Sequence, residues 1–355
     1  MVRPRRNCRQ VMVGNVLVGH GAPISVQSMT NTDTRDVKRT LYQISELADV
    51  GCEIVRVAVP DKEAAEALHY LCRSTPVPLV ADIHFDYRLA LLALEAGIAG
   101  LRINPGNIGD PDRVKKLALM AKEREVPIRI GVNAGSLDKK IQEEHGGITA
   151  EGMVKSALQQ AVLLEDTGHS AIVLSLKASD IPLMIAAYRL AANKCDYPLH
   201  LGVTEAGTVG PGTIRSAVGL GVLLYEGIGD TIRVSLTGNP IEEVKAGYQI
   251  LQSLNLRERG PVIISCPTCG RCQIDLIKLT QEVEKAVSSL KVPLRIAVMG
   301  CAVNGPGEAA GADFGVAGGR GSGLLFRRGK IVRKVPEEQL ASALLEEIRF
   351  VSKPR

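Results

Sequence analysis

The chain has 355 residues, of which 45% are hydrophobic and only 3% aromatic, and its formal net charge is +5. It contains no Trp, and apart from Arg3, Arg5 and Arg6 it has no dense basic run. This composition argues against stacking of nucleic-acid bases and favours a small anion as ligand. The length is sufficient for one full-sized barrel and a smaller module.

Short apolar runs rich in β-branched residues recur through the first 250 residues, each followed by a polar loop and a helical pattern. The predicted strands are Ile24–Met29, Glu53–Val57, Leu79–Ile83, Gly100–Ile103, Ile128–Val132, Ala171–Leu176, Leu199–Val203 and Thr231–Ser235. Eight strand–helix units in this length are typical of an α/β protein with a (β/α)₈ TIM barrel. A doubly wound sheet is less consistent, because no Gly-x-Gly-x-x-Gly follows the first strand.

A second unit is predicted to begin after the charged segment Arg257-Glu258-Arg259-Gly260. The predicted domains are therefore residues 1–256, the barrel, and residues 257–355, a smaller α+β module. Its predicted elements are strands at 262–264, 294–299 and 314–317, a hairpin of 324–326 with 331–335, a helix at about 274–290 and a final helix from Leu340 to Val351. So small a module buries little core, and we expect a bound metal to stabilise it.

Cationic side chains lie at or near the carboxyl ends of five predicted barrel strands, namely Arg56, Arg102, Arg129, Lys177 and Arg233. In TIM barrels these ends meet at one mouth, where the active site lies. A single Arg at a strand end is usually solvated or salt-bridged. Five on corresponding ends predict an anion site, and a diphosphate matches both the charge and the forked guanidinium geometry.

Titratable residues accompany these cations. Asp82 and His84 follow one strand and could pair to cap a loop or act as acid and base. Glu205 follows another strand, where it could orient a cation or exchange a proton with a substrate.

Thiols in the second unit form the other candidate site. Cys266 and Cys269 form a Cys-x-x-Cys pair, and Cys301 lies in a Gly- and Pro-rich segment that ends at Glu308. Soft sulfur ligands favour an iron–sulfur cluster or zinc. No His follows at zinc-finger spacing, so the fourth ligand would be another thiolate, such as Cys272, or an oxygen donor, with Glu308 the nearest candidate.

Several segments together resemble the bacterial hydroxymethylbutenyl diphosphate synthase family of the methylerythritol phosphate route to isoprenoids. They are Ser265–Arg271, Gly300–Glu308, Ser28–Thr32, Ala81–Phe85, Arg102–Asn107 and Gly131–Asn133, in family order over nearly the whole chain. The large insertion of plant-type members is absent.

The resemblance implies reduction of 2-C-methyl-D-erythritol 2,4-cyclodiphosphate by two electrons from a [4Fe–4S] cluster, with ring opening and loss of water. It implies Cys266, Cys269, Cys301 and Glu308 as cluster ligands, while Cys272 is not a ligand in the family pattern. The substrate-facing positions that it implies are Arg56, Arg102, Asn104, Arg129, Asn133, Ser136, Lys177, Glu205, Arg233 and Ser235. It further implies flavodoxin or ferredoxin as electron donor and a homodimer in which one subunit's cluster domain caps the barrel of the other.

Two other functions are consistent with the residues. One is a redox-neutral barrel enzyme acting on a phosphorylated or pterin-like substrate, with a structural zinc site. The other is an electron carrier, although a carrier has no use for five converging cations. The start of the chain has no signal-peptide pattern and no 18-residue apolar stretch exists, so we expect a cytoplasmic protein whose cysteines are reduced.

Overall fold

The computed structural model describes residues 2–103, 111–288, 290, 292–301, 307 and 309–352. The chain divides into two compact units, Met1–Arg257 and Glu258–Arg355. Each unit has its own hydrophobic core among the described residues. In the described residues no helix combines the length and the hydropathy needed to cross a lipid bilayer.

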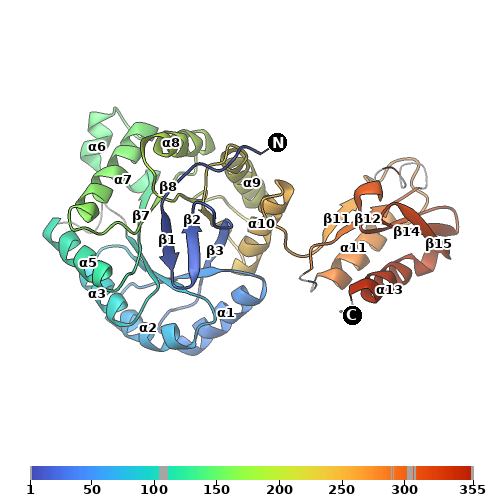
Figure 1. Cartoon of the computed structure of the whole chain (residues 1–355), viewed down its shortest axis with the longest axis horizontal. Coiled ribbons are helices and arrows are strands. Elements are labelled where there is room, and N and C mark those ends of the chain that lie inside the picture. Colours follow the sequence, from blue (N-terminus) through green and yellow to red (C-terminus); the bar gives the residue numbers. More distant parts are fainter. Residues whose placement is uncertain are drawn as a thin grey trace. The chain divides into compact units, whose positions relative to one another are not determined.

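Eight parallel strands form the wall of the first unit (Figure 1). They are β3 (Ser25–Met29), β4 (Ile54–Ala58), β5 (Leu79–Ile83), β6 (Gly100–Ile103), β7 (Ile128–Asn133), β8 (Ile172–Lys177), β9 (His200–Leu201) and β10 (Thr231–Ile232). Their order is β8-β7-β6-β5-β4-β3-β10-β9, and a parallel bridge connects Leu174 of β8 to Leu199, the residue just before β9. The predicted (β/α)₈ barrel is thus confirmed, and the open doubly wound sheet is excluded.

Helices surround this wall and bury their apolar faces against it (Figure 1). They are α1 (Val37–Asp49), α2 (Lys62–Ser74), α3 (Tyr87–Glu95), α5 (Pro111–Glu123), α7 (Ala150–Glu165), α8 (Ile181–Lys194), α9 (Val209–Tyr225) and α10 (Pro240–Ser253), with a short α6 (Lys139–Glu144) before α7. Several begin at an Asp whose carboxylate accepts a first-turn N–H, as Asp61 does from Ala64. These caps fix where each loop at the barrel mouth becomes helix.

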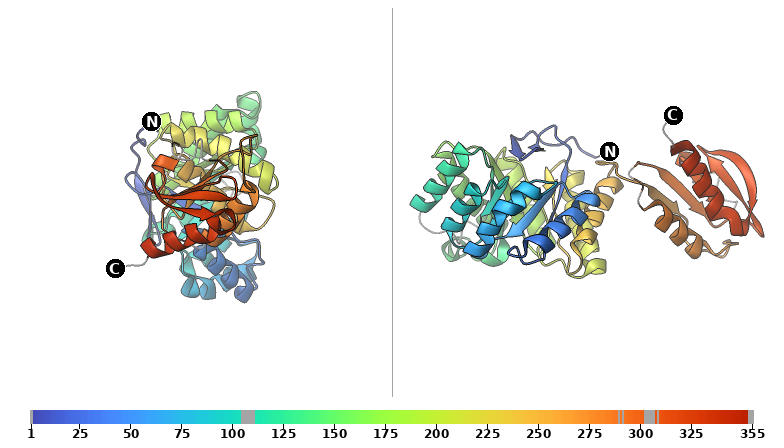
Figure 2. Two further views of the ribbon diagram at one scale, coloured as in Figure 1. Left: turned by 90° about the vertical axis from the view of Figure 1, so that its right-hand side faces the viewer. Right: turned by 90° about the horizontal axis from the view of Figure 1, so that it is seen from below.

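An N-terminal hairpin, β1 (Gln10–Val13) and β2 (Val16–Gly19), covers one end of the barrel (Figure 2, right). Val11, Val13 and Val18 pack with Ile54, Val80 and Val173, which belong to the barrel strands. The sequence analysis did not predict this hairpin. Its signal was present, because Gly14-Asn15 separates two short Val-rich runs and Gly14 has a φ of +58°.

Strands β9 and β10 are shorter than the predicted Leu199–Val203 and Thr231–Ser235. Strand β9 pairs with β10, and β10 also pairs with β3, in each case through only two residues. The apolar residues that follow, Val203 and Val234, are buried nonetheless. Apolar periodicity reports burial rather than ladder bonding, which explains the longer prediction.

A mixed five-stranded sheet forms the second unit. It comprises β11 (Val262–Ser265), β12 (Arg295–Met299), β13 (Phe314–Ala317), β14 (Ser322–Arg327) and β15 (Lys330–Pro336), in that order. The first three strands are parallel and the last two antiparallel. Helices α11 (Leu276–Val287) and α13 (Leu340–Ser352) supply Val283, Leu344 and other residues to its core. Because β11 and β12 are parallel neighbours, the loops that follow them leave the same edge of the sheet.

Candidate functional site

The interior of the barrel is charged. Residues paired across neighbouring parallel strands face the same side of the sheet, and the register pairs Asp82 with Arg102 and Arg102 with Arg129. Asp82, Arg102 and Arg129 are each no more than 6% exposed. TIM-barrel interiors are usually filled with branched apolar side chains, so this charged layer departs from ordinary barrel packing.

Asp82 lies at the centre of one cluster. Its carboxylate accepts a hydrogen bond from Nη1 of Arg102 at 3.0 Å and lies 3.6 Å from Nε of Arg56 and 3.4 Å from Nε2 of His84. Burial raises the pKa of Asp82, but Arg56, His84 and Arg102 outweigh it and hold that pKa below its usual range. Asp82 is therefore ionised and orients two cations.

Glu243 of α10 contacts a different cation, Arg233, in a similar way. One of its oxygens accepts from Ser28 Oγ at 2.9 Å and lies 3.5 Å from Nε of Arg233. The other accepts from the backbone N–H of Leu236 at 3.0 Å. Sequence analysis did not identify Glu243, because it lies inside a helix rather than at a strand end.

Arg129 and Lys177 are buried as well. Burial, reinforced by the neighbouring cations, lowers the pKa of both groups well below their ordinary values. The same causes lower the pKa of Arg56 to about 9, partly offset by Asp82. These interactions show that the predicted cations lie close to one another. An anion placed among them would relieve their mutual repulsion.

His200 of β9 was not predicted and is fully buried within this cluster. Burial, together with Arg129 and Lys177, lowers the pKa of His200 well below its usual value, so its ring is neutral. Neither ring nitrogen has a hydrogen-bond partner among the described residues. Most buried polar groups in folded proteins do have a hydrogen-bond partner, so His200 is unusual in this respect.

Two glycines create room for the cations. A Cβ on Gly131 would lie 2.6 Å from Nε of Arg102, and one on Gly202 would lie 2.5 Å from Nζ of Lys177. Both positions belong to barrel strands or their ends, where glycine normally weakens a strand. Glycine within an otherwise apolar barrel strand was the available sequence signal for this packing.

The remaining predicted residues lie towards the strand ends. Asn133 is half-buried at the end of β7, Ser136 is exposed with its Oγ 3.4 Å from the carbonyl oxygen of Asn133, and Ser235 is half-buried. Glu205 is exposed and has a φ of +53°. His84 is 47% exposed and also contacts Arg102, whose Nη1 lies 3.2 Å from its Nε2. Asn104 lies outside the described residues.

The cysteine loops of the second unit lie together. Cys266 follows β11, and its Sγ accepts from the N–H of Gly300 at 3.2 Å, next to Cys301 at the end of β12. The N–H of Gln273 donates to the carbonyl oxygen of Gly300 at 2.9 Å, which ties the loops a second time. Cys301 is buried and Cys269 exposed. Glu308 lies outside the described residues.

This donor set fits a thiolate-bound metal centre. Three thiols leave one edge of the sheet on two adjoining loops, and a backbone N–H to the Cys266 sulfur is the type of contact that tunes cluster thiolates. The described residues contain no group of three His, Cys, Asp or Glu side chains already arranged around one point. Of the three thiols, Cys269 is the exposed one.

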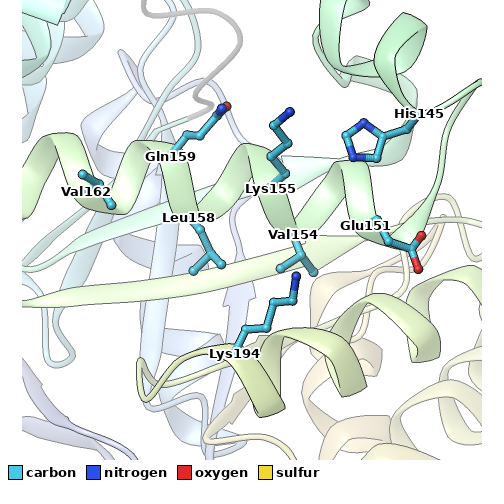
Figure 3. A pocket seen from close by; sticks show the side chains of 8 residues that line it. All are labelled: His145, Glu151, Val154, Lys155, Leu158, Gln159, Val162 and Lys194. Atoms are coloured by element: carbon cyan, nitrogen blue, oxygen red, sulfur yellow. The ribbon is translucent and has the colours of Figure 1, made fainter.

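A groove of about 370 Å³ lies on the outer face of α7 and α8 (Figure 3). Val154 and Leu158 of α7 and Lys194 of α8 line it, with Glu151 and Lys155 at its edge. None of the predicted site residues lines this groove. It is thus separate from the charged interior.

The comparisons with known proteins agree over both units. Residues 8–248 match the GcpE TIM-barrel domain and residues 262–350 match the GcpE protein C-terminal domain. The chain is 62% identical over 343 residues, 97% of each chain, to the 4-hydroxy-3-methylbut-2-en-1-yl diphosphate synthase (flavodoxin) of Geobacter sulfurreducens. It is 56% identical to the enzyme of the same name from Ruminiclostridium cellulolyticum, over 97% of this chain and 98% of the relative.

Some solved structures of other proteins match about 70% of the chain. The type I 3-dehydroquinate dehydratase of Clostridium difficile aligns with a TM-score of 0.50 and 15% identity, over 70% of this chain and 98% of that one. At this identity the likeness concerns fold and not chemistry. The matches to both GcpE domains and the 62% identity across 97% of the chain show that this protein belongs to the GcpE family.

Proposed function

We infer that the chain is a 4-hydroxy-3-methylbut-2-en-1-yl diphosphate synthase of the methylerythritol phosphate pathway. The observation that carries this conclusion is the charge inside the barrel. Five cations, Arg56, Arg102, Arg129, Lys177 and Arg233, interact there, while Asp82 and Glu243 are the two carboxylates in contact with them among the described residues. This excess of positive charge in a buried site calls for a polyanionic ligand.

The proposed substrate, 2-C-methyl-D-erythritol 2,4-cyclodiphosphate, would supply that anion. The guanidinium groups of Arg56 and Arg102 are pre-oriented by Asp82, and that of Arg233 by Glu243. Fixed donors bind a diphosphate with little loss of side-chain freedom. Asn104, Asn133, Ser136 and Ser235 are proposed to bind the uncharged part of the substrate nearer the mouth.

Three titratable residues are proposed to serve proton transfer or substrate orientation at the mouth. The ring of His84 contacts both Asp82 and Arg102. It remains partly exposed, so it can also contact a bound molecule. Glu205 lies in the loop after β9 and has a left-handed backbone conformation, so its carboxylate is carried on a tight turn. Asp82 orients the cations and, being ionised, does not donate a proton.

The residues proposed to hold a [4Fe–4S] cluster are Cys266, Cys269, Cys301 and Glu308. The cluster would supply the electrons for reductive ring opening and loss of water. A carboxylate ligand is harder and more easily displaced than a thiolate, which is the reason to expect Glu308 to leave one iron accessible. Flavodoxin is the proposed electron donor, and the proposed assembly remains a homodimer.

An anaerobic test separates this proposal from a zinc protein. Wild-type protein purified without oxygen should be brown, contain about four irons per chain, and convert the cyclic diphosphate when supplied with reduced flavodoxin. Cys269→Ser should lose the iron–sulfur absorption, whereas the matched variant Cys272→Ser should keep it. A colourless protein containing zinc and no iron would favour the redox-neutral alternative.

A further inference from the structure

Beneath the cluster of cations, the barrel encloses a small cavity of about 20 Å³. Gln27 of β3, Arg129 of β7 and Thr231 of β10 are its polar lining, and Val13 and Val18 of the hairpin close it from below. All three polar residues are at most 6% exposed. A cavity of this size accommodates about one water molecule. The three side chains therefore form a layer between the hairpin and the proposed diphosphate site.

Hydrogen bonds connect this layer in one direction. Arg129 Nη1 donates to Oε1 of Gln27 at 3.1 Å, and Nε2 of Gln27 donates to Oγ1 of Thr231 at 2.8 Å. Thr231 Oγ1 in turn donates to the carbonyl oxygen of Ser25 at 3.1 Å. A guanidinium can only donate, so the amide orientation and the hydroxyl direction are both determined by Arg129 at one end and the backbone at the other.

The partner of Arg129 differs from those of the other guanidinium groups. Arg56 and Arg102 share the carboxylate of Asp82, and Arg233 contacts that of Glu243. Among the described residues, the hydrogen bond found for Arg129 goes to a neutral amide. An amide fixes the guanidinium without cancelling its charge, so that charge remains available to an anion.

We propose that Gln27 and Thr231 are positioning residues that hold the Arg129 guanidinium for diphosphate binding while leaving its charge uncompensated. The inference rests on the proposed function, because it assumes that the barrel binds a diphosphate. Neither residue needs to contact the substrate, since their effect is transmitted through Arg129.

The test measures binding of inorganic pyrophosphate to the full-length protein by calorimetry, together with thermal unfolding without ligand. Gln27→Glu keeps an acceptor beside Arg129 but adds a negative charge. We expect pyrophosphate affinity to fall about tenfold or more, while the unfolding temperature is retained or raised because a buried cation gains a counter-charge. A merely structural role would make affinity and stability change together.

Thr231→Val preserves shape but removes the hydroxyl that fixes the amide of Gln27. Pyrophosphate affinity should fall about three- to tenfold, the factor expected for one lost hydrogen bond, and Thr231→Ser should restore it. In turnover assays the loss should appear in KM for the cyclic diphosphate more than in kcat. The matched control is Tyr248→Phe, which removes a buried hydrogen bond to the Gly51 carbonyl oxygen at 2.8 Å on the outer side of the strands. It should lower stability without changing affinity.

Wild-type affinity in Gln27→Glu, or equal losses in Thr231→Ser and Thr231→Val, would overturn the proposal. So would absence of pyrophosphate binding by the wild-type protein, because Arg129 would then have no anion to receive. The proposed function is judged separately, by turnover of the cyclic diphosphate by wild-type protein.

Discussion

Single residues set the space available to the cations, and Gly202 is the clearest case. A Cβ there would lie 2.5 Å from Nζ of Lys177 and 2.7 Å from the carbonyl oxygen of Arg233, so neither neighbour can yield without moving the site. We expect Gly202→Ala to lower kcat/KM for the cyclic diphosphate about tenfold or more, because misplaced donors bind the transition state poorly.

Steady-state kinetics will check this expectation, with Gly221→Ala of α9 as the control. A Cβ on Gly221 meets nothing within 4 Å, so that variant should retain full activity and gain up to about 1 kcal/mol of helix stability. Unchanged kcat/KM in Gly202→Ala would show that Lys177 does not need its observed place.

Protonation of a single residue should also affect stability. The pKa of His200 is lowered by burial and by Arg129 and Lys177, whereas in the unfolded chain it titrates near about 6.5. Below that pH the His200 ring binds a proton in the unfolded state but not in the folded state. The free energy of unfolding should therefore fall as pH decreases below about 6.5, by up to about 1.4 kcal/mol per pH unit.

Urea unfolding of wild type and His200→Gln between pH 5 and pH 7.5 will isolate this contribution. The variant cannot take up the proton, so its unfolding free energy should depend less steeply on pH in this range. Parallel pH profiles for the two proteins would mean that the pKa of His200 is the same in the folded and unfolded states.

Among the secondary-structure elements, the β1–β2 hairpin closes one end of the barrel. Val18 is fully buried and packs against strand residues of the barrel end. We expect Val18→Ala to lower the free energy of unfolding by about 2 kcal/mol, the sum of lost burial and a residual cavity. Its neighbour Leu17 is 36% exposed, so Leu17→Ala should cost less than about 0.5 kcal/mol in the same denaturation experiment. Equal losses would indicate that the hairpin does not pack as described.

Sequence patterns predicted the elements better than the contacts between them. Periodicity located β5, β6 and β13 at their observed bounds, because burial on a parallel or central strand produces an unbroken apolar run. The same patterns indicated that five cations converge on one mouth, since strand ends of a barrel must meet.

What the patterns lacked was long-range information. Glu243 reaches Arg233 from inside α10, and His200 and Thr231 face the interior within runs that read simply as strand. Their roles depend on register, such as the pairing of Thr231 with both Ser25 and His200, which no local pattern encodes. The hairpin strands were also missed, because they precede the repeating strand–helix units on which the prediction was based.

The whole molecule distributes its charge unevenly. Residues 258–355 contain 15 Lys and Arg against 10 Asp and Glu, whereas residues 1–257 contain 28 of each, so the formal excess of +5 belongs to the second unit. Between Phe314 and Pro336 there are six basic residues and no acidic one. Lys330 and Lys334 of β15 are exposed there. A flavodoxin with a negatively charged surface would be attracted to this unit.

We therefore expect the KM for flavodoxin to rise with ionic strength, and to rise several-fold in the double variant Lys330→Glu, Lys334→Glu at low salt. Turnover driven by a small chemical reductant should be unchanged in that variant, since the barrel is untouched. The control carries the same change of total charge on the first unit, at the exposed Lys38 and Lys116. An equal effect of both double variants on the flavodoxin KM would mean that only net charge matters.

The packing of the β1–β2 hairpin across one end of the barrel has a consequence for the kinetics of turnover. Because the hairpin covers one end of the barrel, substrate must enter and product must leave through the opposite end. The product of the proposed reaction retains both phosphates, so we expect the cations proposed to bind the cyclic diphosphate to bind the product as well. We therefore expect release of the product to contribute to the rate of turnover.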